Sequence, residues 1–197
     1  MAARSLVLAS ASAARLRLLR DAGLDPRVVV SGFDESSLTV DEPAELVEQL
    51  AISKAEVVAA DCSNELVIGC DSLLVFDGQV YGKADSPAEV VTRWQRWRGK
   101  QGVLLTGHCV IDTATGGRVS EVGTTAVRFG NPDDAELAAY AQTEEALSVA
   151  GPFTIDGRAA AFIDGIDGDA GNVIGISLPL LRALLSRLGV GVTDLWS

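Results

Sequence analysis

A mostly apolar stretch in the first half of the chain has the residue types of a buried β-strand. Val67–Phe76 contains Val67, Ile68 and Leu73–Phe76, residues typical of a buried strand, and one acid, Asp71, lies within it. Asp77-Gly78 follows and favours a two-residue hairpin turn, because glycine accepts positive φ and aspartate tolerates it. We therefore predict a buried strand, a tight turn and a short return strand that leads to Lys83.

The register of this hairpin decides whether Asp71 and Lys83 can act together. If Phe76 pairs with Gln79, strict alternation sends the side chains of Asp71 and Lys83 to opposite faces of the sheet. They converge only if the pairing ends or bulges near Gly82, a residue type that suits a bulge. A buried acid is costly unless it is paired, hydrogen-bonded or metal-bound, so Asp71 is either bonded to backbone at a strand end or part of a site.

The N-terminal segment has the pattern of an anion site. Ser5–Ala9 is strand-like, Ser12 suits a helix N-cap, and Ala13–Ala22 is helical in composition up to Gly23. A strand that runs through a serine-rich turn into a helix presents free N–H groups, hydroxyl donors and a positive dipole end. Arg15 in the first turn could add a bidentate phosphate contact, although an ordinary capped surface helix has the same pattern.

Two later segments place further candidate residues. The polar loop Gly32–Ser37, with Glu35, follows the predicted strand Arg27–Ser31, and a carboxylate beyond a strand end is either a Mg²⁺ ligand or a solvated loop residue. A helix is predicted for Pro43–Ala60, and Lys54 borders its apolar face. Such a lysine either snorkels to water or points inward as a phosphate-binding cation.

The second half of the chain mixes strands and helices. Ser86-Pro87 opens a helix whose tryptophans, Trp94 and Trp97, we expect to be packing or interface residues rather than a base-stacking pair. We interpret His108 as a core or edge histidine that is hydrogen-bonded and inert, in preference to a catalytic one. Further strands are predicted at 103–112, 118–129 and 159–166, and the chain ends with an apolar helix near residue 189. This order predicts an α/β fold with a mixed sheet flanked by helices.

Composition narrows the class of protein. A length of 197 residues with 48% hydrophobic residues favours one domain, 1–197, with a sizeable core. The net charge of −11 argues against nucleic-acid binding, whereas a small phosphate ligand needs only a local group of cations. Three cysteines without CxxC spacing and a single histidine indicate a reducing compartment and exclude a multi-histidine zinc site. No signal peptide or membrane span is visible, so we expect a cytoplasmic protein without membrane or nucleic-acid partners.

Several short motifs, in order over nearly the whole chain, resemble those of the Maf family of nucleoside triphosphate pyrophosphatases, the septum-formation Maf-like proteins. The matching segments are Leu8-Ala9-Ser10-Ala11-Ser12 with Arg15 and Leu18-Leu19, Asp34-Glu35-Ser36, Leu50-Ala51 with Lys54-Ala55, Ile68-Gly69-Cys70-Asp71-Ser72 with Gly82-Lys83, Thr106-Gly107-His108, Ala150-Gly151, and Asn172-Val173-Ile174-Gly175 before Leu178-Pro179. Each motif is weak alone, and the order and spacing make the set specific.

The resemblance implies hydrolysis of a nucleoside triphosphate, ribo or deoxy and of a non-standard or modified kind, to the monophosphate and pyrophosphate. It implies an elongated, twisted sheet with two lobes around a central cleft, related to the inosine-triphosphatase type. A divalent cation, Mg²⁺ or Mn²⁺, would assist. The assigned catalytic residues are Asp71, Glu35, Lys54 and Lys83, with Asp71 as the base and with Glu35 and Asp71 as metal ligands. The assigned substrate-binding residues are Ser10, Ser12, Arg15, Ser72 and Asp156.

The chain departs from the family at three positions associated there with base choice. Ala14 stands where an arginine is usual, Ser72 where a threonine is frequent, and Asp156 aligns with a glutamine of the dTTP/UTP branch. An inserted Ser177 also splits the usual pattern of the last motif. Two alternatives stay open: a related hydrolase with another nucleotide substrate, and a nucleotide-binding regulatory module, linked to cell division, with little turnover. A homodimer is left open as well.

The replacement of glutamine by Asp156 generates a prediction on base preference. An ionised carboxylate only accepts hydrogen bonds, whereas glutamine both donates and accepts. If Asp156 faces the base, it favours the amino groups of guanine or cytosine over the O2 and O4 acceptors of uracil and thymine. Asp156→Gln should then shift kcat/KM toward UTP and dTTP relative to CTP and GTP. An unchanged ranking would place Asp156 on a solvated turn away from the base.

Overall fold

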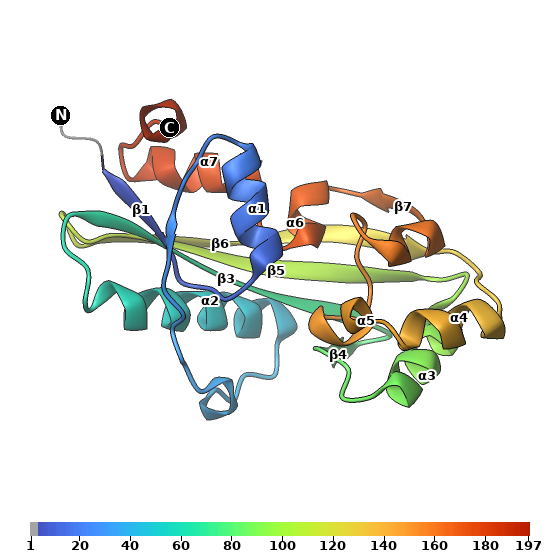
Figure 1. Ribbon diagram of the computed structural model, residues 1–197. Coiled ribbons are helices and arrows are strands. Elements are labelled where there is room, and N and C mark those ends of the chain that lie inside the picture. Colours follow the sequence, from blue (N-terminus) through green and yellow to red (C-terminus); the bar gives the residue numbers. More distant parts are fainter. Residues whose placement is uncertain (1–3) are drawn as a thin grey trace. The chain divides into compact units, whose positions relative to one another are not determined.

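A computed structural model describes residues 4–197, and its strands form one mixed sheet (Figure 1). The strands are β1 (Ser5–Leu8), β2 (Arg27–Val28), β3 (Glu65–Phe76), β4 (Gln79–Tyr81), β5 (Gln101–Asp112), β6 (Gly117–Phe129) and β7 (Ile163–Asp167). Their order is β2-β1-β3-β5-β6-β7, with β4 paired to β3. Parallel pairs at β1 and antiparallel pairs at β3–β4 and β6–β7 confirm the predicted mixed sheet.

Helices connect and cover the strands. They are α1 (Ala13–Asp21), α2 (Pro43–Ala59), α3 (Pro87–Trp97), α4 (Asp134–Ala141), α5 (Glu144–Ser148), α6 (Ala170–Ile174) and α7 (Leu178–Arg187), with 3₁₀ turns η1 (Glu35–Ser37), η2 (Arg158–Phe162) and η3 (Val192–Leu195). Among the described residues, no helix combines the length and the apolarity that crossing a membrane requires.

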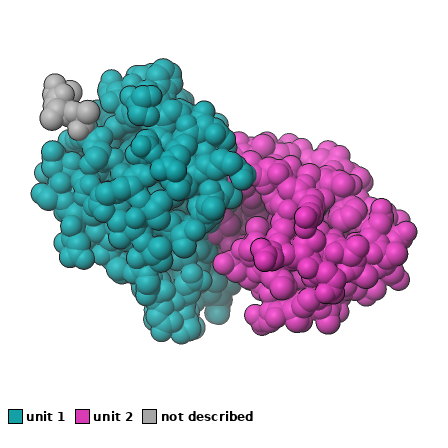
Figure 2. Space-filling view, in the orientation of Figure 1, with its two compact units in different colours: residues 1–71, 106–123, 175–197 teal, residues 72–105, 124–174 magenta. Residues whose placement is uncertain are grey.

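The chain divides into two compact units built from interleaved segments (Figure 2). Unit 1 comprises the segments up to residue 71, 106–123 and 175–197, and unit 2 comprises 72–105 and 124–174. Strands β3, β5 and β6 each contribute residues to both units. The expectation that the chain is a single domain stays a prediction.

In unit 1, helices cover both faces of the sheet (Figure 1). Leu6 and Leu8 of β1 point to the face covered by α1 and α7, whereas Val7 packs with Ala51 and Ala55 of α2 on the other face. This alternation explains why the strands are apolar at successive positions, since both faces are buried.

In unit 2, the two tryptophans of α3 lie within the core, so of the two predicted roles, packing and interface, the structure shows packing. Trp94 and Trp97 are fully buried, and both rings lie against Phe129, with centroid distances of 5.4 and 5.5 Å. The indole N–H of Trp94 donates to the carbonyl of Pro152 at 2.9 Å. A satisfied donor inside an apolar cluster is typical of packing, not of base stacking.

The predicted hairpin is confirmed in detail. Phe76 pairs with Gln79, and the turn residues Asp77 and Gly78 have φ values of 49° and 72°. The ladder ends at Leu74↔Tyr81, so Lys83 lies beyond it. Strict alternation therefore no longer fixes the direction of the Lys83 side chain.

Two strand predictions were wrong in extent. β2 ends at Val28 rather than Ser31: Val29 still donates to the carbonyl of Leu8 at 3.0 Å, but β1 offers no later residue to pair with. Residues 159–162 form η2 instead of a strand, because the carboxylate of Glu145 accepts the N–H groups of Arg158 and Ala159 at 2.9 and 3.0 Å. A side chain thus takes the donors that a strand would need.

Helix α2 approaches the sheet closely at two glycines of unit 1. A Cβ at Gly69 of β3 would lie 2.2 Å from the carbonyl oxygen of Ala51, and one at Gly107 of β5 would lie 2.1 Å from that of Val47. Both obstacles are backbone atoms and cannot rotate away. The two glycines therefore determine how closely α2, the helix that carries Lys54, packs against the sheet.

We expect Gly69→Ala and Gly107→Ala each to lower the free energy of unfolding by about 1–3 kcal/mol, because the added methyl displaces α2. Gly82→Ala is the matched control, since a Cβ there meets nothing within 4 Å. Chemical denaturation of the three variants measures the effect. Wild-type stability in Gly69→Ala or Gly107→Ala would contradict the close approach.

Candidate active site

The candidate site of unit 1 lies where β1 and β2 end and β3 continues. Leu8, the last residue of β1, pairs in parallel with Val28 and with Ile68. From β1 the chain passes through α1 to β2 on one side, and from β2 through α2 to β3 on the other. Ligands of open α/β sheets bind outside the carboxyl ends of strands at such a reversal of strand order. The residues that follow Leu8, Val28 and Ile68 are therefore the first candidates.

The serine turn after β1 is closed by Arg15. Ser12 caps α1, as predicted, and its Oγ accepts the N–H of Arg15 at 3.3 Å. The Oγ of Ser10 accepts the N–H of Ser12 at 3.2 Å and the Nη1 of Arg15 at 3.0 Å. Hydroxyl groups, a helix N-terminus and a guanidinium thus gather within one turn, a set that suits a phosphate group.

The direction of the Arg15 side chain depends on Gly175. The Nε of Arg15 donates to the carbonyl of Gly175 at 2.8 Å. Gly175 has a φ of 128°, and a Cβ there would lie 3.0 Å from the same Nε. Only glycine suits this position, and neither the conformation nor the contact could be inferred from the sequence without the structure.

His108 anchors the same segment from the core. It is buried; its Nε2 accepts the N–H of Ser177 at 2.8 Å, and its Nδ1 lies 2.9 Å from the carbonyl of Thr106. Because Nε2 accepts, the ring proton is on Nδ1 and is donated to Thr106. The predicted hydrogen bonding is confirmed, and of the two predicted positions, core and edge, the structure shows the core. Ser177, the apparent insertion, also caps α7 through the N–H of Leu180.

Lys54 lies between two carboxylates. Its ammonium is hydrogen-bonded to Oδ1 of Asp71 and lies 2.7 Å from Oε1 of Glu35. The side chains of Lys54 and Asp71 are each 13% exposed, whereas Glu35 is 57% exposed. Lys54 does not snorkel to bulk solvent, and Asp71 has a charged partner, which reduces the cost of burying both.

The donor set fits a divalent cation only with help from a ligand. Glu35 and Asp71 already converge on one cation, the ammonium of Lys54. Within residues 4–197 no group of three or more His, Cys, Asp or Glu side chains could hold a metal ion. Mg²⁺ is commonly held by one or two carboxylates, substrate phosphates and waters, so two carboxylates are sufficient when a phosphate ligand completes the shell.

Cys70 is a buried cysteine of β3 that immediately precedes Asp71. Burial raises the pKa of its thiol to about 11, and the positive charges of Arg15 and Lys54 act in the opposite direction. The thiol is therefore neutral and serves in packing.

The other three predicted site residues belong to unit 2. Ser72 follows Asp71 in β3 and is partly buried, and Lys83 is exposed beyond β4. Asp156 is exposed in a turn, where its carboxylate is hydrogen-bonded to the hydroxyl of Thr154. An exposed turn is the position expected if Asp156 is solvated and lies away from the base. A contact between Asp156 and a base stays a prediction.

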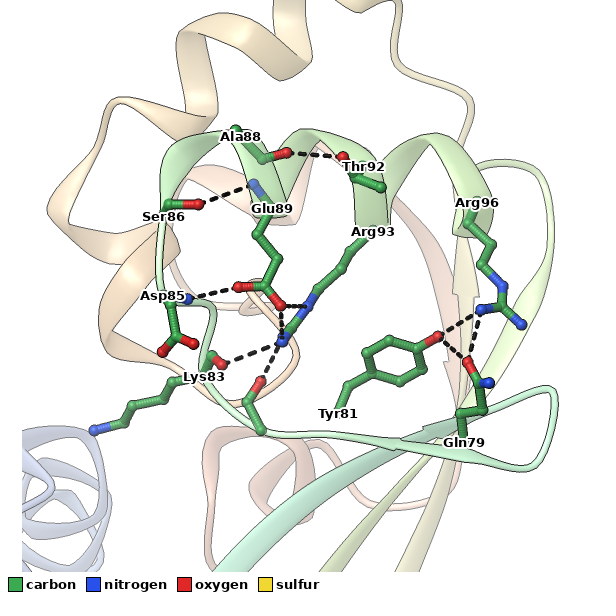
Figure 3. Close-up of polar contacts among 11 residues, drawn as sticks. Gln79, Tyr81, Lys83, Asp85, Ser86, Ala88, Glu89, Thr92, Arg93 and Arg96 are labelled. Atoms are coloured by element: carbon green, nitrogen blue, oxygen red, sulfur yellow. Dashed lines mark hydrogen bonds and ion pairs between the residues drawn. The ribbon is translucent and has the colours of Figure 1, made fainter.

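The backbone around Lys83 is held by a residue that the sequence analysis did not single out (Figure 3). Arg93 of α3 donates through Nη1 to the carbonyl of Gly82 at 2.8 Å and through Nη2 to that of Lys83 at 3.3 Å. The only sequence signal was the spacing of Glu89 and Arg93, which form an i,i+4 ion pair at 2.6 Å.

Comparisons of the sequence with known proteins identify the family. The sequence model of the family described as Maf-like protein matches residues 5–188. Proteins named nucleoside triphosphate pyrophosphatase are similar over 98% of the chain: that of Streptomyces coelicolor is 59% identical and covered to 95%, and that of Synechocystis sp. is 49% identical and covered to 98%. A protein of the same name from Mycobacterium sp. is 46% identical, with 98% of each chain covered. The chain therefore belongs to the Maf-like protein family.

Proposed function

We propose that this chain hydrolyses nucleoside triphosphates to the monophosphate and pyrophosphate. The observation that carries the proposal is the ammonium of Lys54 between Glu35 and Asp71, at the strand ends where the serine turn and Arg15 offer an anion site. The activity named for the relatives, at up to 59% identity, supports the same chemistry. A reducing, cytoplasmic setting is part of the proposal, and the three cysteines, all free thiols, support it.

The serine turn would bind and orient the phosphates. The N–H groups at the start of α1, the hydroxyls of Ser10 and Ser12 and the guanidinium of Arg15 are held by one another and by Gly175. Donors fixed before binding do not have to be reorganised during the reaction. Phosphoanhydride cleavage depends chiefly on such positioning and on charge stabilisation.

Asp71 would act as the base. A water oxygen attacks the α-phosphorus, the bond from that phosphorus to the bridging oxygen of pyrophosphate breaks, and the water proton passes to a carboxylate oxygen of Asp71. Lys54 holds this carboxylate in one orientation and can contact a phosphate oxygen with another of its three N–H donors. Glu35 completes the orientation of Lys54 from the exposed side.

A divalent cation, Mg²⁺ or Mn²⁺, would be held by Glu35, Asp71 and phosphate oxygens, and when bound it neutralises charge on the triphosphate. Lys83, Ser72 and Asp156 of unit 2 are proposed to contact the phosphates and the base, on the strength of the resemblance. Both units would thus serve one enzyme over residues 1–197.

A panel of standard and modified ribo- and deoxyribonucleoside triphosphates tests the function. The readout is pyrophosphate release with Mg²⁺, with Mn²⁺ and with chelator. We expect metal-dependent release of pyrophosphate and the matching monophosphate. Nucleotide binding without any product would refute the hydrolase and support a regulatory module instead.

We predict that Asp71→Asn lowers kcat by about 10²–10⁴-fold, because the amide has nearly the same volume but cannot take up the proton. The melting temperature should stay close to that of the wild type. Glu56→Gln, a change at an exposed acid of α2 paired with Arg118, is the matched control and should keep its activity. Near-normal turnover by folded Asp71→Asn would remove Asp71 from the mechanism.

Lys54→Met should lower kcat/KM by about 10²–10³-fold, since it removes a charged donor from the developing phosphate charge while keeping the apolar stem. The same substitution leaves the carboxylate of Asp71 buried without its charged partner, so it should lower the free energy of unfolding by about 3–5 kcal/mol. Lys100→Met, at an exposed lysine, is the control for loss of a positive charge. If Lys54→Met lost stability but kept kcat/KM, Lys54 would be structural.

A further inference from the structure

Arg93 fixes the backbone on which Lys83 is mounted. Its Nη1 donates to the carbonyl of Gly82 at 2.8 Å, and its Nη2 donates to the carbonyl of Lys83 at 3.3 Å (Figure 3). The guanidinium also lies over the ring of Tyr81, 5.3 Å from the centroid. Arg93 thus contacts three successive residues, the last residue of β4 and the two that follow it.

Glu89 orients Arg93 and holds the other side of the same segment. Its Oε1 accepts Nε and Nη2 of Arg93 at 3.1 and 2.6 Å, and its Oε2 accepts the N–H of Asp85 at 2.8 Å. The Asp85 N–H and then the Arg93 guanidinium hold the pKa of the Glu89 carboxyl below its usual range. Backbone groups before and after Lys83 are therefore fixed by one ion pair.

The ion pair differs from an ordinary i,i+4 pair on a helix surface. The side chain of Arg93 is only 13% exposed, and two of its nitrogens are bound to carbonyls of an irregular segment. The carbonyl of Gly82 also accepts the N–H of Gly151 at 3.0 Å, which ties in the segment that leads to Asp156. In Figure 3 the side chain of Lys83 extends away from this network, so its backbone is fixed while its ammonium is presented outward.

We propose that Arg93 is a positioning residue for Lys83: by fixing the carbonyls of Gly82 and Lys83 it directs the Lys83 ammonium toward the triphosphate. This inference rests on the proposed function, in which Lys83 binds phosphate. A lysine has a long and flexible stem, so its effective concentration at a phosphate depends on how firmly its backbone is held. The forked guanidinium can hold two carbonyls at once, which an ammonium cannot do with the same geometry.

The test is a double-mutant cycle with Lys83→Ala, measured on the best substrate of the triphosphate panel. Arg93→Met keeps the apolar stem against Tyr81 and removes the fork. We expect it to lower kcat/KM about 10–100-fold in the wild-type background and less than about 2-fold in Lys83→Ala, because its effect passes through Lys83. Arg93→Lys should recover part of the loss, since one carbonyl can still be bound.

Arg96→Met is the matched control on the same helix. The guanidinium of Arg96 contacts Oε1 of Gln79 at 2.7 Å and the hydroxyl of Tyr81 at 2.9 Å, so it supports the hairpin but not the Lys83 backbone. Arg96→Met removes the same charge as Arg93→Met and should change kcat/KM by less than about 2-fold. If Arg93→Met does not fold, Glu89→Gln replaces it, because this change weakens the ion pair that orients Arg93 but leaves a hydrogen-bond acceptor. Its loss of kcat/KM should be smaller and must also vanish in the Lys83→Ala background.

Three results would overturn the proposal. Equal losses of kcat/KM in the two backgrounds would show that Arg93 acts independently of Lys83. A lower melting temperature with unchanged kcat/KM would make Arg93 merely structural. An active Lys83→Ala would refute the role of Lys83 itself. Only this last result bears on the proposed function, since the first two leave pyrophosphate release by the wild-type chain and the loss in Lys83→Ala intact.

Discussion

The ammonium of Lys54, shared by Glu35 and Asp71, is the interaction on which the candidate site depends. An acid within an apolar strand and a lysine beside an apolar helix face are each costly to bury, and each compensates the other. The contact requires α2 to lie close to the sheet, which the bare backbone of Gly69 and Gly107 permits. The packing of the core thus sets the distance between a proposed base and a proposed phosphate-binding cation.

The order of the strands supplies the rest of the site in unit 1. Strand β1 lies between β2 and β3, and Leu8 pairs with Val28 and with Ile68. The serine turn follows Leu8, the loop that contains Glu35 follows Val28, and Asp71 follows Ile68 along β3. Hydrogen bonds then fix the orientation of the Arg15 side chain. Arg15 donates to the carbonyl of Gly175, and the segment that contains Gly175 is held by the hydrogen bond from Ser177 to His108. His108 therefore supports an arginine of the proposed phosphate site from within the core.

Local signals in the sequence were sufficient where short-range physics decides the structure. The Asp77-Gly78 turn, its register and the Ser12 and Ser86 caps follow from φ preferences and from side chains that accept nearby N–H groups. The extent of β2 and of the segment after Gly157 could not be predicted in this way. They depend on where a neighbouring strand ends and on a carboxylate, that of Glu145, which is distant in the sequence.

The sequence by itself determined the class of fold, the burial of both tryptophans, and the residue types of a phosphate-handling site in family order. Only the tertiary structure decided whether Lys54 meets water or Asp71, because an amphipathic helix fixes a face but not the neighbour of that face. It also revealed the role of Arg93, because only the spacing from Glu89 distinguishes this residue in the sequence from Arg96, the other arginine of α3, and nothing there indicates its carbonyl contacts. Hydrogen bonds across long sequence separations arise from chain packing, and no local pattern encodes them.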